Sequence, residues 1–193
     1  VLEDGSVMEG IGFGSKQQSV GEIVFNTSMS GYQEIITDPS YAKQIIAFTH
    51  PHIGNTGIND EDNESDNIFA SAIVIKDLPK NYSNWRANQS LESFLLSKHT
   101  IGISNIDTRA LTAKLREHGS LKACIAPGGK ESLSKANDAL NQFNGLEGRD
   151  LAKEVSTKNS CLWNEGTWPN YQDGIDEKLI VEIDYRDKKN SLR

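Results

Sequence analysis

The stretch "TDPSY" at residues 37–41 places a serine hydroxyl at a tight corner of the chain. The Asp38-Pro39 step favours a turn, because proline presets φ and the Ser40 hydroxyl can bond to the local backbone. A serine in such a setting is either a structural cap or a contact to a ligand. Local chemistry alone favours the structural role for Ser40.

Four histidines are the next residues that could do chemistry. His50 and His52 of "HPH" lie two positions apart, so an extended segment would present both rings on one side to a metal. The neighbouring sequence offers no third ligand, and we interpret both as hydrogen-bonded loop residues. His99 and His118 fall at predicted helix C-termini, where a partial positive charge complements the helix dipole.

Two motifs are similar to ligand-binding loops but miss the required spacing. The acidic run "NDEDNESD" at 59–66 begins like a calcium loop, yet Ser65 replaces the sixth-position glycine and Ser71 the twelfth-position glutamate. We interpret it as a solvated acidic loop. In "GIGFGS" at 10–15 the third glycine comes one residue early for a dinucleotide loop, and a strand-like run surrounds it. We therefore predict no metal site and no bound cofactor in this chain.

The sequence contains two cysteines, Cys124 and Cys161, which are far apart. Such spacing does not fit a disulfide framework or a zinc site, so we predict that both are reduced and structural. Neither lies in a glycine-rich strand-to-helix turn of the kind that presents a nucleophile. We predict no catalytic residue in this chain.

Composition limits the partners. The chain has 193 residues, a net charge of -7 and a pI near 5.1, which disfavours nucleic acid because that affinity comes mainly from Lys and Arg. The start of the chain shows no signal sequence, and no apolar run approaches the roughly 18 residues of a membrane span. We therefore expect no nucleic acid, no membrane and a cytoplasmic location.

Hydrophobic periodicity predicts an α/β fold. Helices are indicated at 88–99, between Asp107 and Gly119, and after residue 129, each with apolar residues at core spacing. Strands come first and then alternate with helices, which indicates sheet layers covered by helices on one side. The predicted strands are short β-branched or aromatic runs at 6–13, 21–28, 43–50, 67–75 and 101–106.

The C-terminal part has a different pattern. Residues 169–178 are polar and turn-rich, as in an interdomain linker. The run "LIVEIDY" at 179–185 is typical of the buried first strand of a parallel α/β sheet. We predict a first domain at 1–168, a linker at 169–178, and the start of a truncated second domain at 179–193.

Four long strings together carry a resemblance: "GEIVFNTSMSGYQEIITDPSYAKQII", "HPHIGNTGIN", "NIDTRALTAKLREHG" and "GRDLAKEVST". They resemble the N-terminal domain of the small, glutamine-hydrolysing subunit of carbamoyl-phosphate synthetase, over residues 1–168. The resemblance implies a swivelling three-layer β/β/α fold. The terminal "VEIDYRDKKNSLR" is similar to the opening strand of that family's class I amidotransferase domain.

The resemblance also implies a function. In that family a Cys thiolate activated by a His-Glu pair hydrolyses glutamine, and those residues would belong to the domain that is cut short here. Ammonia then passes to a large subunit, which uses ATP, Mg and bicarbonate to make carbamoyl phosphate for arginine and pyrimidine biosynthesis.

For this chain, the resemblance implies docking to the large subunit and a contact from Ser40 to glutamine. The alternatives are a non-catalytic binding module with the same fold, and a hydrolase that uses Ser40 with His50 or His52.

Overall fold

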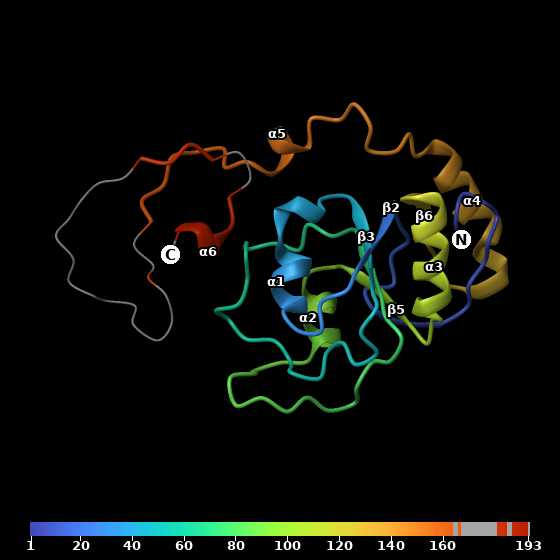
Figure 1. The fold of residues 1–193 in the computed structure, drawn as a ribbon, viewed down its shortest axis with the longest axis horizontal. Helices are drawn as coiled ribbons and strands as arrows, with labels where there is room; N and C mark the ends of the chain where they lie inside the picture. The colour runs from blue at the N-terminus through green and yellow to red at the C-terminus, as the bar shows by residue number, and fades with distance from the viewer. Residues whose placement is uncertain (164–165, 167–180, 185–186, 193) are drawn as a thin grey trace.

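The computed structural model describes residues 1–163, 166, 181–184 and 187–192 (Figure 1). Its strands are β1 (Ile11–Gly14), β2 (Ser19–Asn26), β3 (Gln44–Phe48), β4 (Ala72–Val74), β5 (Ile101–Ser104) and β6 (Leu121–Ile125). Its helices are α1 (Tyr32–Thr37), α2 (Leu91–Ser97), α3 (Thr108–His118), α4 (Leu133–Gln142), α5 (Leu151–Val155) and α6 (Lys189–Leu192). Two 3-10 turns, η1 (Pro39–Tyr41) and η2 (Gly129–Ser132), complete the set. Within these residues, no helix is both long enough and apolar enough to cross a membrane.

The strands form one sheet in the order β1-β5-β4-β3-β2-β6. Its four central strands, β2 to β5, run parallel to one another, whereas the edge strands β1 and β6 are antiparallel to their neighbours. The centre of the register places Ile45 of β3 opposite Ile23 on one side and Ala72 on the other. Parallel central strands need covered faces, which explains why β3 is apolar and buried from Ile45 to Phe48.

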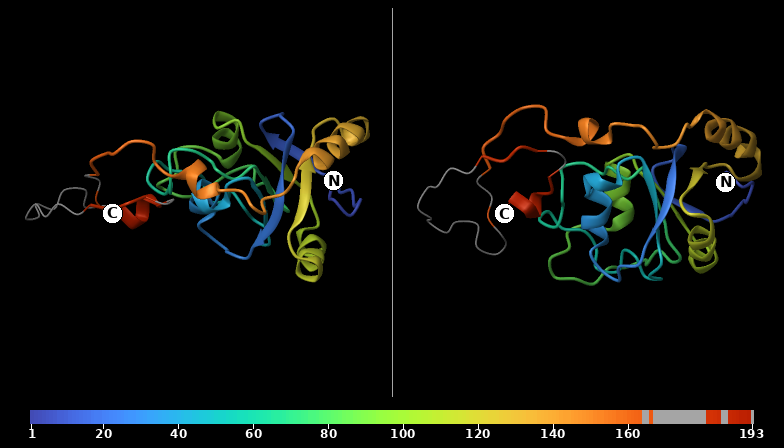
Figure 2. Two further views of the ribbon diagram at one scale, coloured as in Figure 1. Left: turned by 90° about the horizontal axis from the view of Figure 1, so that it is seen from above. Right: turned by 45° about the horizontal axis from the view of Figure 1, so that its top comes forward.

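Each face of the sheet carries its own core. Side chains alternate along β3, so Ile46 and Phe48 join one cluster while Ile45 and Ala47 join the other. The first cluster includes residues of α1 and α2, and the second includes residues of α3. Figure 2 shows these helices on opposite sides of the sheet. A smaller cluster packs α4 against Cys124 of β6.

The α/β class is therefore confirmed, but the expected layering is wrong. Helices cover both faces of the sheet, because the buried alternation of β3 leaves an apolar surface on each side. All strands of the described residues belong to the single sheet. The second sheet layer of a β/β/α arrangement is not seen in that part of the chain.

Helix boundaries follow the predicted signals. The Ser90 hydroxyl accepts a hydrogen bond from the Ser93 N–H at 3.1 Å and caps α2. Asp107 likewise caps α3 by accepting from Ala110 N–H at 2.9 Å, and Gly119 ends that helix with φ 83°.

The C-terminal part differs from its prediction. The predicted linker at 169–178 lies outside the described residues, and residues 181–184 of the predicted strand are not in a strand. Instead, the Asp184 carboxylate accepts hydrogen bonds from the backbone N–H groups of Thr157 (2.6 Å) and Asp187 (2.7 Å). A strand needs a neighbour for its backbone hydrogen bonds, and no strand of the described residues pairs with 181–184.

Candidate functional site

The turn that carries Ser40 begins where α1 ends. Asp38 leaves the helical conformation at φ -70° and ψ 120°, and its Oδ1 accepts a hydrogen bond from the Ser40 N–H at 2.8 Å. The backbone N–H of Tyr41 donates to the Asp38 carbonyl, and Pro39 occupies the first position of the turn, where its missing N–H costs nothing. The capping role considered for Ser40 thus belongs to Asp38. The Ser40 hydroxyl is half-buried and makes no hydrogen bond within the described residues.

An acidic loop, residues 59–66, is fastened to the same helix. The Gln33 side chain of α1 accepts from the Asn59 N–H at 3.0 Å and donates to the Asn59 carbonyl at 2.5 Å. At the end of α1, the Thr37 hydroxyl accepts from the Glu64 N–H at 2.9 Å. The acidic loop therefore packs beside the Ser40 turn as one unit with α1.

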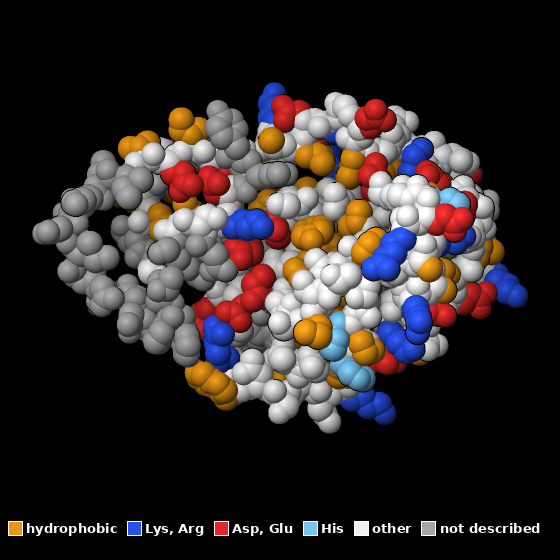
Figure 3. Space-filling model, viewed as in Figure 1, with side chains coloured by type: hydrophobic (Ala, Val, Ile, Leu, Met, Phe, Trp, Pro, Cys, Tyr) orange, Lys and Arg blue, Asp and Glu red, His pale blue; other side chains and the backbone are white. Residues whose placement is uncertain are grey.

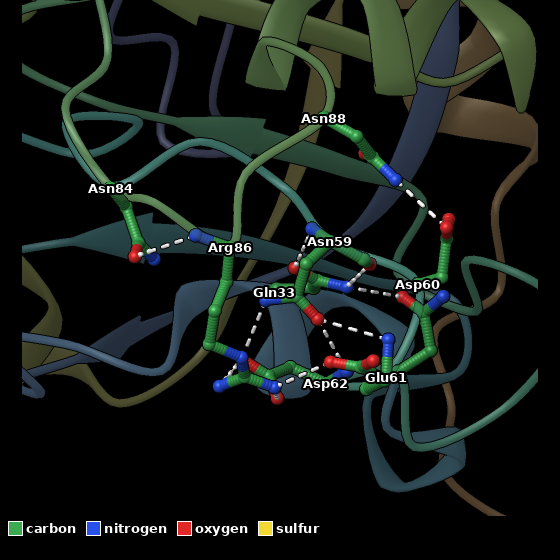
Figure 4. A network of polar contacts seen from close by, with 9 residues as sticks. Gln33, Asn59, Asp60, Glu61, Asp62, Asn84, Arg86 and Asn88 are labelled. Atoms are coloured by element: carbon green, nitrogen blue, oxygen red, sulfur yellow. Dashed lines mark hydrogen bonds and ion pairs between the residues drawn. The ribbon is translucent and has the colours of Figure 1, made fainter. Parts of the chain in front are cut away.

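Arg86 pairs with two carboxylates of this acidic loop, as Figure 4 shows. The guanidinium bonds both carboxylate oxygens of Asp62, at 2.7 and 3.3 Å, and reaches Glu61 at 2.9 Å. The hydrogen bond to Glu61, with further bonds to Asp62, raises the pKa of Arg86. No group of side chains suited to a metal ion occurs among the described residues.

The prediction of a solvated acidic loop is correspondingly wrong in part. Asn59 and Glu64 are buried, and the carboxylates of Glu61 and Asp62 are held by Arg86. Sequence alone could not show that a loop far along the chain supplies their cation.

The C-terminal segment reaches the Ser40 turn. Lys188 Nζ lies 2.7 Å from Asp38 Oδ2, and this hydrogen bond is the main cause of a raised Lys188 pKa. The same side of the molecule concentrates negative charge: burial, followed by the nearby Asp62 and Glu64, raises the pKa of Glu34 on α1. Figure 3 shows acidic side chains grouped here, between the body of the molecule and the C-terminal segment, with basic ones among them.

The remaining candidates lie apart from this turn. The His50 and His52 rings meet edge to face with centroids 6.0 Å apart, and no described hydrogen bond joins either to Ser40. Both cysteines are free thiols; Cys124 is buried in the α4 cluster, as a structural residue should be, but Cys161 is exposed. The structural role predicted for Cys161 is therefore not found.

A cavity of about 560 Å³ lies on the α3 side of the sheet. Its walls are mainly apolar and include Phe13, Ile103, Leu111 and Ile125. None of its lining residues belongs to the Ser40 turn. It is a separate feature of the fold.

Comparison with known proteins defines the class to which this fold and turn belong. Residues 1–125 match the sequence model of the family "Carbamoyl-phosphate synthase small chain, CPSase domain". The chain belongs to that family.

Individual relatives agree with this assignment. The chain is 49% identical over 201 residues to the carbamoyl phosphate synthase small chain of Vibrio parahaemolyticus, an alignment covering all of this chain and 53% of the relative. It is 53% identical over 167 residues to the small chain of Thioalkalivibrio sulfidiphilus, covering 86% of this chain and 44% of the relative. The chain thus spans about half the length of the curated relatives that it matches.

Proposed function

We propose that this chain forms the N-terminal part of the glutamine-hydrolysing subunit of a carbamoyl-phosphate synthetase. In this role it docks to the large subunit and supplies Ser40 as one wall of the glutamine site. The nucleophile that hydrolyses glutamine belongs to the amidotransferase domain, the other part of the subunit. The ammonia released is combined with bicarbonate by the ATP- and Mg-using large subunit.

The observation that carries the glutamine contact is the way the turn presents Ser40. Asp38 binds the Ser40 N–H, so the hydroxyl is not needed to cap the turn and is left available. A serine hydroxyl can both donate and accept, so it can bond either the carboxylate or the ammonium group of free glutamine. The capped turn fixes the backbone of Ser40 in advance, which reduces the entropy lost on binding.

Docking to a large subunit is supported by large apolar side chains that are exposed to solvent. Trp85 is 81% exposed and Met29 76% exposed. Aromatic residues and methionine are enriched at protein interfaces, where burial of such surface contributes binding energy.

The test uses the full-length subunit assembled with its partner. Ser40→Ala removes one neutral hydrogen bond, a loss of about 1 kcal/mol. That corresponds to a roughly fivefold rise in the glutamine concentration needed for half-maximal synthesis. Synthesis from added ammonia should stay unchanged, because ammonia bypasses the glutamine pocket.

Ser65→Ala is the matched control. The Ser65 hydroxyl is nearby but already donates to the Thr37 carbonyl at 2.6 Å, so it serves the fold. Its loss should destabilise the loop without a selective effect on glutamine. If Ser40→Ala lowers the glutamine and ammonia reactions equally, or changes neither, the proposed glutamine contact is wrong.

A further inference from the structure

Asp38 uses its two carboxylate oxygens for two different parts of the chain. Oδ1 accepts from the Ser40 N–H at 2.8 Å, and Oδ2 faces Lys188 Nζ at 2.7 Å. Asp38 is only 7% exposed, although it lies at a turn. One buried side chain therefore connects the Ser40 turn directly to the C-terminal segment.

Lys188 is one of two neighbouring residues through which the C-terminal segment binds the body of the protein. The Lys189 N–H donates to the Glu64 carbonyl at 3.0 Å, and the Lys189 ammonium pairs with Asp66. The Glu64 N–H in turn donates to the Thr37 hydroxyl, so the contact of Lys189 is connected to the end of α1. Residues 188 and 189 thus bond to the two places that flank the Ser40 turn, Asp38 and the acidic loop.

Because Asp38 is buried, Lys188 compensates a charge that water cannot reach freely. A buried carboxylate that loses its cation keeps its desolvation cost, so the turn must rearrange or admit water. Any such rearrangement moves the Ser40 N–H, because the same carboxylate holds it. Lys188 is 42% exposed at its side chain, so its replacement leaves no cavity in the core.

We propose that Asp38 is a positioning residue: through its bond to Lys188 it fixes Ser40 relative to the part of the subunit that follows residue 181. This inference rests on the proposed function, in which that following part carries the amidotransferase chemistry. Ser40 then contacts glutamine correctly only while Asp38 is bound to both partners.

A double-mutant cycle in the full-length subunit, assembled with the large subunit, tests this. Asp38→Asn keeps an oxygen for the Ser40 N–H but removes the charge that faces Lys188, and Lys188→Met removes the cation. Each should raise the half-saturating glutamine concentration by about fivefold, and the double variant should be no worse than either single one, because residues in contact are coupled. The rate with added ammonia should not change.

Lys43→Met is the matched control. Lys43 lies just after the turn and pairs with Glu154, but this pair is more exposed and does not touch Asp38 or Ser40. It should leave the glutamine requirement unchanged.

Three results would overturn the inference. Effects of the single variants that multiply in the double variant would mean that Asp38 and Lys188 act independently. An equal fall in the ammonia reaction for both single variants would mean that Asp38 and Lys188 only maintain the fold. If neither variant changes the half-saturating glutamine concentration while Ser40→Ala raises it, the inference fails and the proposed function stands. Failure of Ser40→Ala itself would instead reject the proposed function.

Discussion

Asn26 donates a hydrogen bond from Nδ2 to the Tyr41 phenolic oxygen at 3.0 Å, which ties the last residue of β2 to the last residue of the Ser40 turn. The turn is thus held from both ends, by Asp38 at its start and by the sheet at its end. Tyr41→Phe removes only the hydroxyl and should lower the free energy of unfolding by about 1 kcal/mol. Urea unfolding measures this. If the losses of stability from Tyr41→Phe and Asn26→Ala simply add in the double variant, the assigned pairing is wrong.

The cap of α3 should have a measurable value. Asp107→Ala removes the acceptor for the Ala110 N–H and should cost about 1 kcal/mol of stability. Asp107→Asn keeps a side-chain oxygen and should cost much less. Thermal unfolding of the three proteins checks the order, and an alanine variant as stable as the wild type would show that water replaces the cap without loss.

Glu34 should make stability depend on pH. Burial raises its pKa in the folded state above the ordinary value of 4.5, so the carboxyl favours the folded state only while it is protonated. That contribution is complete below about pH 4.5 and is lost as the pH rises through the folded pKa. Glu34→Gln should therefore stabilise the protein at pH 7 and have little effect at pH 4. A gain of equal size at both pH values would show that charge is not the cause.

The two thiols should react at very different rates. Burial raises the pKa of Cys124 and closes access to it, whereas Cys161 is exposed. A thiol reagent should titrate one group quickly in the native protein and both in denaturant. Cys161→Ser should abolish the fast phase, and survival of that phase in the variant would mean that the α4 cluster opens readily.

Local signals predicted much of the fold. Asp107 and Gly119 were identifiable as the two ends of a helix, because such signals act within a few residues. Helix α1 was missed because it is short and its N-cap residue, Gly31, offers no capping side chain. Strand β6 was also missed, since its pairing with β2 joins distant parts of the chain.

At the candidate site, local sequence signals predicted less than they did for the fold. Ser40 could be singled out from its turn, and the resemblance of its surroundings gave it a proposed ligand. The partners that hold the turn could not be found in this way. Neither Lys188 opposite Asp38 nor Arg86 opposite Asp62 has a sequence signal, because each ion pair exists only after the chain has folded.

The alternation along β3 determines which changes of length this protein can tolerate. Deleting a single residue within Gln44–Phe48 would turn every following side chain of the strand to the other face, exchanging what α1 and α2 contact with what α3 contacts. Each core would then receive side chains of the wrong size, although the strand would remain just as hydrophobic. We therefore expect insertions and deletions to be accepted in the surface connections, such as residues 79–82, and rejected throughout this strand, even where substitutions between aliphatic residues are harmless.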